Sequence, residues 1–359
     1  MSIVHFGLGL VCLVIGAESL VRGAARLALS FGVSPLVVGL TVVAFGTSTP
    51  ELSVSMQAAW IDKADIALGN VVGSNIVNVL VILGISALIV PLVVANQLIR
   101  QEVPLMIAIS LLLLALAFDG LVSRLDGALF TAILVAYTVF VIRQSRRQGL
   151  ASPDEPPDAA TGWRGHWITQ AVLIVAGLAL LVLGAHWLVD AAIGLAQHMG
   201  ISELVIGLTV VAIGTSLPEI ATSIVAALRG QRDMAVGNVV GSNLFNIAGV
   251  LGLSSLVAPS GVAVPASMLS FDIPVMIGVA IACLPIFFTG NLIARWEGGL
   301  FLAAYAAYVA YLVMASRNHD ALNTFGPAMV WGVLPAVVLT LVVVSWREWR
   351  ARRVERPRA

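Results

Sequence analysis

The chain has 359 residues, of which 59% are hydrophobic and 11% are charged, and its 19 basic and 19 acidic residues give a formal net charge of zero. Soluble proteins carry a charge on about a quarter of their residues. The composition therefore excludes a soluble enzyme or a nucleic-acid-binding protein, and it indicates an all-α polytopic membrane protein.

Apolar runs near the length of about 20 residues that crosses a bilayer predict eleven membrane-spanning helices. Five precede a polar stretch, at residues 3–26, 35–60, 66–91, 103–118 and 126–142. Five more follow it, at residues 167–189, 203–228, 235–258, 272–290 and 297–315, and the eleventh lies at 326–346.

The basic residues fall mainly on one side of this arrangement. Counting loops alternately places 16 of them on one face and only Lys63, Arg124 and Arg317 on the other. Since basic residues favour the cytoplasmic side, we expect the N-terminus outside and the C-terminus in the cytoplasm, in a cell (inner) membrane. Arg22 and Arg26 follow the first apolar run, which is the reverse of the charge order in a signal peptide.

Residues 144–165 contain the sequence SPDEPPD and no apolar periodicity, which predicts a cytoplasmic linker. The predicted organisation is a first five-helix repeat (1–143), the linker (144–165), a second five-helix repeat (166–316), and an extra helix with a basic tail (317–359).

Two segments of the chain nearly repeat each other. Gly39–Glu51 and Gly207–Glu219 agree at 11 of 13 positions, and Gly69–Asn78 and Gly237–Asn246 agree at 8 of 10, all with one shift of 168 residues. Because the copies lie five helices apart, they cross the membrane in opposite directions. Inverted repeats of this kind place a substrate site near the bilayer midplane, where both GTSxPE motifs are centred.

Each GTSxPE motif also predicts a helix break. Pro50 and Pro218 have no amide hydrogen, and each crowds the carbonyl group four residues earlier. Non-helical backbone at membrane depth is tolerated where it lines a cavity, so the carbonyl groups of Ala44 and Ala212 become candidate oxygen ligands.

The midplane offers oxygen ligands in matching sets from the two repeats. A carboxylate at the bilayer centre costs on the order of 3 kcal/mol, so a duplicated one indicates function rather than accident. Oxygen ligands without His or Cys favour hard cations such as sodium and calcium. The candidates are Glu51, Thr47, Ser48, Ser74 and Asn78, and Glu219, Thr215, Ser216, Ser242 and Asn246.

The sequence GTSTPE with GNVVGSN, repeated as GTSLPE with GNVVGSN, resembles the alpha-repeats of the sodium/calcium exchanger family, of the prokaryotic antiporter type. The resemblance covers the first ten helices. It implies a central calcium site at Glu51 and Glu219, with backbone oxygen from Thr47 and Thr215 and an amide lining from Asn78 and Asn246. It also implies sodium sites formed by Ser48, Ser74, Ser216 and Ser242 and completed by the carbonyl groups of Ala44 and Ala212.

The resemblance implies a secondary antiporter that exchanges Ca²⁺ for Na⁺ by alternating access, rather than an enzyme, and it implies no cofactor. Some relatives carry an acid at the position of Asn246, and the amide here predicts independence from potassium. A proton/calcium antiporter of the same fold remains open. A membrane-embedded hydrolase and a channel are further alternatives. A hydrolase does not require hydroxyl and amide ligands repeated around each glutamate, and the inverted symmetry favours alternating access over a channel.

Three acidic residues outside the motifs have simpler interpretations. Glu18 lies one helical turn before Arg22, which predicts a local ion pair. Glu102 and Asp272 each precede a proline at the start of a span, which predicts helix capping. For the motif glycines we expect close helix packing.

Overall fold

The computed structural model describes residues 2–148, 167–198 and 212–316. Within these ranges, eight helices are long and apolar enough to cross a membrane, and a bent pair, Pro35–Thr47 with Thr49–Trp60, makes a ninth span. The all-helical membrane architecture is thereby confirmed. The eleventh predicted span, 326–346, lies outside the described residues.

The first half of the chain crosses the helical bundle five times. Its long helices are interrupted by π-helical turns (η1, η2, η3), a 3-10 turn (η4) and two short strands. The elements are α1 (Ser2–Phe31), α2 (Pro35–Val38), η1 (Gly39–Val43), α3 (Ala44–Thr47), α4 (Thr49–Trp60), α5 (Ala64–Val77), η2 (Asn78–Leu83), α6 (Gly84–Ile89), β1 (Leu92–Val93), η3 (Leu98–Glu102), α7 (Val103–Leu116), η4 (Ala117–Asp119), β2 (Leu121–Val122) and α8 (Arg124–Gln148).

The second half follows the same order of elements in the part that the structure describes. Its π-helical turns η7 and η8 match η2 and η3. The elements are α9 (Trp167–His198), α11 (Ala212–Thr215), α12 (Leu217–Leu228), α13 (Arg232–Phe245), η7 (Asn246–Leu251), α14 (Gly252–Val257), β3 (Val262–Ala263), η8 (Met268–Asp272), α15 (Ile273–Phe288), β4 (Leu292–Ile293) and α16 (Arg295–Ser316).

The predicted spans and the observed helices agree in place and differ at their ends. The helix α1 continues to Phe31, five residues beyond the predicted end, and α8 continues to Gln148 into the predicted linker. Residues 149–165 of that linker and residues 203–211 of the seventh predicted span lie outside the described residues.

The two motif-bearing spans after the helix breaks form the centre of the bundle. Within the most apolar 18-residue stretch of each span, 89% of residues are buried in Arg232–Val257 and 78% in Ala64–Ile89. Only 11% are buried in Arg295–Ala315. The outer helices instead expose apolar side chains such as Val175 and Phe140, which suits contact with lipid tails. The repeated motifs are therefore surrounded by protein.

Two pairs of short antiparallel strands join the halves of the chain. Leu92 pairs with Ile293 in the β1–β4 pair, and Leu121 pairs with Ala263 in the β2–β3 pair. Each pair links a loop of the first half to a loop of the second, so the two loops must lie on the same side of the membrane. The inverted arrangement predicted from the sequence places both pairs of loops in this way.

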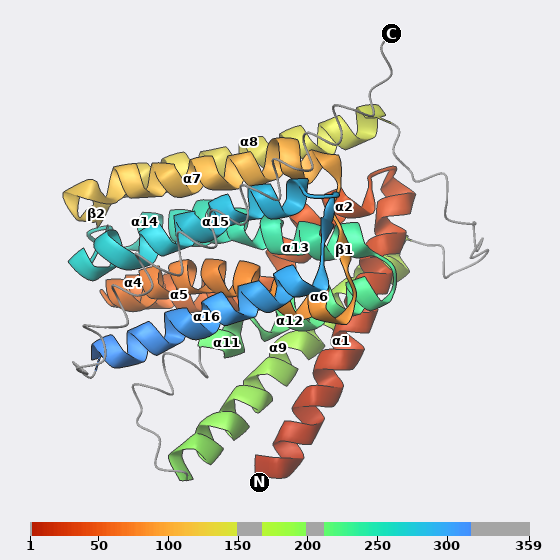
Figure 1. Cartoon of the computed structure of the whole chain (residues 1–359), viewed down its shortest axis with the longest axis horizontal. Coiled ribbons are helices and arrows are strands. Elements are labelled where there is room, and N and C mark those ends of the chain that lie inside the picture. The colour runs from red at the N-terminus through yellow and green to blue at the C-terminus, as the bar shows by residue number, and fades with distance from the viewer. Residues whose placement is uncertain (1, 149–166, 199–211, 317–359) are drawn as a thin grey trace.

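The helices α1 and α9 run side by side at a steep angle to the remaining helices (Figure 1). Glycines allow them to approach closely, since a Cβ atom built on Gly16 would lie 2.8 Å from the Gly177 carbonyl oxygen. Motif glycines act similarly in the central bundle, where a Cβ atom on Gly241 would lie 2.7 Å from the Leu40 carbonyl oxygen. The packing role expected for these glycines is confirmed at this position.

The ion pair predicted at the end of α1 forms and extends to a second helix. Glu18 pairs with Arg22, and its carboxylate also accepts a hydrogen bond of 2.9 Å from Arg229 Nε at the end of α12. Arg229 Nη2 lies 2.6 Å from the other carboxylate oxygen. The acid therefore connects α1 to the central bundle.

The capping role predicted for Glu102 and Asp272 is wrong. Neither side chain caps the following helix. Glu102 instead accepts hydrogen bonds from Tyr137 (2.6 Å) and Gln97 (2.8 Å), and Asp272 accepts one from Tyr308 (2.8 Å). In both places, the preceding π-helical turn continues into the helix without exposing free amide groups, so the carboxylates bond to a tyrosine on the next helix instead.

Candidate functional site

The helix breaks lie at Ser48 and Ser216, one in each repeat. The backbone angles are φ −82°, ψ 10° at Ser48 and φ −87°, ψ 6° at Ser216, both outside the helical well. The two parts of the first span meet at 47°. Pro50 and Pro218 follow in the first turn of the next helix, where a missing amide hydrogen costs nothing.

Both glutamates lie in the first turn of the helix after the break, and both side chains are only 1% exposed. Ser48 Oγ donates to Glu219 Oε1 at 3.0 Å, and Ser216 Oγ lies 3.4 Å from Glu51 Oε1. Spacing along the helix predicts Ser48 beside Glu51, but the break turns its hydroxyl toward the opposite repeat. Each carboxylate thus takes its serine from the other half of the chain.

The two carboxylates are close enough to repel each other electrostatically. No basic residue forms a recorded ion pair with either within the described ranges. Two buried carboxylates without a counter-charge are costly, and a cation between them would remove both the repulsion and the lack of a counter-charge.

The predicted carbonyl ligands lie on the short helices before the breaks. The helix α3 begins at Ala44 and ends at Thr47, and α11 begins at Ala212 and ends at Thr215. The Thr47 hydroxyl donates back to the Val43 carbonyl at 3.0 Å. The Ala44 carbonyl accepts the Ser48 amide at 3.1 Å and lies 3.5 Å from the Thr47 hydroxyl.

The amide and hydroxyl candidates lie on the central spans. Ser74 and Ser242 are buried one turn before Asn78 and Asn246, and each asparagine begins a π-helical turn. Such turns are frequent at functional sites.

Several of these buried oxygens have no hydrogen-bond partner, although buried polar atoms are almost always paired. The unpaired atoms come from both repeats, and most of them are acceptors. They are Glu51 Oε2, Glu219 Oε2, Asn78 Oδ1, Asn246 Oδ1, Asn246 Nδ2 and Ser242 Oγ. A carboxylate, amide and hydroxyl set of this kind fits a hard cation.

Interhelical hydrogen bonding was one of two roles that the sequence left open for Asn70 and Asn238, but sequence reasoning missed their partners Ser55 and Ser223. Asn70 Nδ2 donates to Ser55 Oγ at 2.9 Å, and Asn238 Nδ2 donates to Ser223 Oγ at the same distance. Both serines lie four residues after the motif glutamate and are related by the 168-residue shift. Extending the repeat alignment beyond the motif would have found them.

A second repeated pair was also missed. Ser86 and Ser254 obey the same shift, are buried, and have hydroxyl groups without a partner. Neither hydroxyl is hydrogen-bonded to a glutamate of the cluster.

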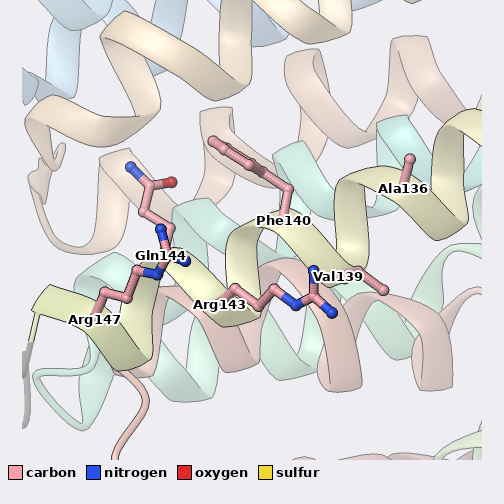
Figure 2. Close-up of a pocket in the computed structure, with 6 residues that line it drawn as sticks. All are labelled: Ala136, Val139, Phe140, Arg143, Gln144 and Arg147. Carbon is pink, nitrogen blue, oxygen red and sulfur yellow. The ribbon is translucent and has the colours of Figure 1, made fainter.

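A hollow of about 520 Å³ lies away from this cluster, at the end of α8 (Figure 2). Its lining is basic and apolar, and it includes none of the candidate site residues. The lining residues are Ala136, Val139, Phe140, Arg143, Gln144 and Arg147.

The sequence and fold match known proteins over most of their length. The model of the sodium/calcium exchanger protein family matches residues 1–143 and 169–314. The chain is 38% identical over 285 residues to inner membrane protein YrbG of Escherichia coli, covering 77% of this chain and 86% of that one. It is 35% identical over 339 residues to sodium/calcium exchanger MaX1 of Methanosarcina acetivorans, covering 85% and 96%.

Solved structures of the sodium-calcium exchanger NCX_Mj show the same fold. The crystal form soaked with zero Na⁺ and Ca²⁺ matches with a TM-score of 0.74 at 32% identity, over 87% of this chain and 98% of that one. A form soaked with Na⁺ and Sr²⁺ matches with a TM-score of 0.73 at 33% identity. The family consists of integral membrane transporters, not enzymes. The chain belongs to the sodium/calcium exchanger protein family.

Proposed function

We propose that this protein is a secondary antiporter that exchanges Ca²⁺ for Na⁺ by alternating access to the cluster around Glu51 and Glu219. The observation that carries the proposal is the set of unpaired buried oxygens to which both repeats contribute. Relatives and structural neighbours named as sodium/calcium exchangers support it.

The charge of the cluster can be neutralised by either of the two exchanged cations. Its two carboxylates are the acids that the repeats contribute, and one divalent ion neutralises both. Two sodium ions would do the same, whereas three would leave one positive charge. Calcium and sodium therefore compete without sharing a position, because binding of either cation offsets the same buried charge.

The ligand roles follow the repeat symmetry. In this proposal Glu51 and Glu219 bind Ca²⁺, with the carbonyl groups of Thr47 and Thr215 and the amides of Asn78 and Asn246 around them. Sodium occupies flanking positions whose oxygens come from Ser48, Ser74, Ser216, Ser242 and the carbonyl groups of Ala44 and Ala212.

The decisive experiment measures calcium flux in proteoliposomes containing the purified protein. We expect ⁴⁵Ca²⁺ uptake by vesicles that are loaded with Na⁺ and diluted into a medium containing a large inert cation in place of Na⁺. Adding K⁺ is expected to have no further effect. Uptake driven by an imposed pH gradient and indifferent to sodium would contradict the sodium proposal and establish the proton/calcium antiporter instead.

The location and orientation of the protein in the membrane form a separate part of the proposal. We propose a cell (inner) membrane location with the N-terminus outside, which rests on the distribution of basic residues. The strand pairs support the alternation of loops on which that distribution was counted.

A further inference from the structure

A second pair of buried asparagines lies behind the amides of the cluster. Asn75 and Asn243 are related by the 168-residue shift, and each contacts a methionine of the opposite repeat. Asn243 Nδ2 lies 3.4 Å from Met106 Sδ, and Asn75 Nδ2 lies 3.5 Å from Met276 Sδ. A thioether has no proton to give, so in both pairs the amide donates and the sulfur accepts.

The contacts of Asn243 fix which way its amide faces. Its Nδ2 atom also lies 3.4 Å from the backbone carbonyl oxygen of Asn75, which is another acceptor. The amide nitrogen must therefore face Met106 and this carbonyl, and the amide oxygen must face the other way. There Asn243 Oδ1 accepts a hydrogen bond of 3.0 Å from Asn78 Nδ2.

The orientation of Asn78 follows from that bond. Because its amide nitrogen is held by Asn243, its oxygen points away from Asn243, and this Oδ1 atom is buried without a partner. A chain of contacts thus runs from Met106 through Asn243 to Asn78 and ends in a free oxygen of the kind that a cation requires.

The symmetry-related chain is present except for its last contact. Met276 accepts from Asn75, but Asn75 Oδ1 has no partner, and neither amide atom of Asn246 has one. A bond from Asn246 Nδ2 to Asn75 Oδ1 would be the counterpart of the Asn78–Asn243 bond. One chain is closed and the other is open in the same structure.

We propose that Met106 and Met276 are positioning residues that set the orientation of the amide ligands Asn78 and Asn246 through Asn243 and Asn75. The thioether side chains suit this role because they are apolar, flexible and weak acceptors, so they direct an amide without competing for the cation. The open chain leaves Asn246 free to turn, and closing it presents Asn246 Oδ1 to the cluster. That the cation is calcium rests on the proposed function.

The test replaces Met106 by leucine, which keeps the volume but removes the acceptor. Calcium affinity is measured without transport, from the rise in thermal unfolding midpoint of the purified protein as Ca²⁺ is added. For Met106→Leu we expect the half-saturating Ca²⁺ concentration to rise about ten-fold, the lower end for partners of metal ligands. Met106→Gln supplies an acceptor oxygen of similar reach and is expected to restore the affinity.

Met234 provides the matched control, because it is fully buried on α13 and has no recorded contact with an amide. Met234→Leu is expected to leave calcium affinity unchanged. In a double variant, adding Met106→Leu to Asn78→Ala is expected to cause no further loss, since the methionine acts through that asparagine. Should Met106→Leu not fold, Met276→Leu is assayed in the same way, with Asn246→Ala in the double variant.

Two results overturn the proposal. One is a Met106→Leu protein with the same calcium affinity as Met234→Leu, and the other is a double variant in which the two losses add. A wild-type protein whose unfolding midpoint responds to no calcium contradicts the proposed function itself, which separates the two failures.

Discussion

Each glutamate of the cluster depends on a serine from the other half of the chain. The bonds Ser48–Glu219 and Ser216–Glu51 cross between repeats, so neither carboxylate is held by its own helix alone. A carboxylate that is buried and lacks a basic partner binds a cation strongly if one reaches it. The exchange of serines therefore makes the two halves into one site rather than two.

The charge of these carboxylates predicts the effect of removing it. Glu51→Gln or Glu219→Gln is expected to reduce calcium uptake in proteoliposomes to the background level, since one neutral amide leaves a single negative charge for a divalent ion. Glu102→Gln is the control, because Glu102 is equally buried but bonded to Tyr137 and Gln97. Near-normal uptake by either cluster variant would refute the two-carboxylate site.

The serines at the helix breaks are expected to affect sodium more than calcium. Ser48→Ala or Ser216→Ala removes a neutral oxygen but leaves both carboxylates, which dominate the attraction for a divalent ion. The half-saturating Na⁺ concentration in the exchange assay is then expected to rise more than that for Ca²⁺. Ser53→Ala, an exposed change on the same helix, serves as the control, and equal shifts for both ions would argue against separate sodium positions.

At the scale of helices, the sequence predicted those features that local chemistry determines. Pro50 and Pro218 predicted the breaks, and the structure has them at Ser48 and Ser216. The end of α1 was predicted too early because the apolar run closes at Arg26, yet the helix continues to Phe31.

Other features could not be predicted because they depend on partners distant in the sequence. A two-residue strand such as β1 has no periodicity to detect, and its partner β4 lies about 200 residues away. Met106 has the sequence context of an ordinary core residue, and only the fold places it against Asn243. The candidate site residues remain a prediction from the sequence, and their cross-repeat contacts required the structure.

The close contact of α1 and α9 gives a stability prediction. Alanine favours a helix over glycine by about 1 kcal/mol, so Gly278→Ala, with open space around it, is expected to raise the thermal unfolding midpoint. Gly16→Ala would place a methyl group 2.8 Å from the Gly177 carbonyl oxygen and is expected to destabilise by about 1–3 kcal/mol through overpacking. A higher midpoint for Gly16→Ala than for wild type would show that this contact is loose.

At the scale of the whole molecule, the inverted repeat predicts opposite exposure of equivalent positions. Lys63 and Gln231 are related by the 168-residue shift, each between the two motif-bearing spans of its repeat. With Cys12 and Cys283 replaced by alanine, Lys63→Cys is expected to react with an impermeant thiol reagent in intact cells, and Gln231→Cys only in inverted vesicles. Labelling of both from one side would contradict the inverted topology.

The strand pairs described above have a consequence for the assembly of the chain. A single half would leave the backbone groups of two strands without partners and one carboxylate without its serine. The halves are therefore mutually dependent, so that either one synthesised alone lacks the means to complete its own fold. Two fragments divided within residues 149–166 and produced together in one cell would find in each other every contact that each lacks, and we expect them to reassemble without a peptide bond between them.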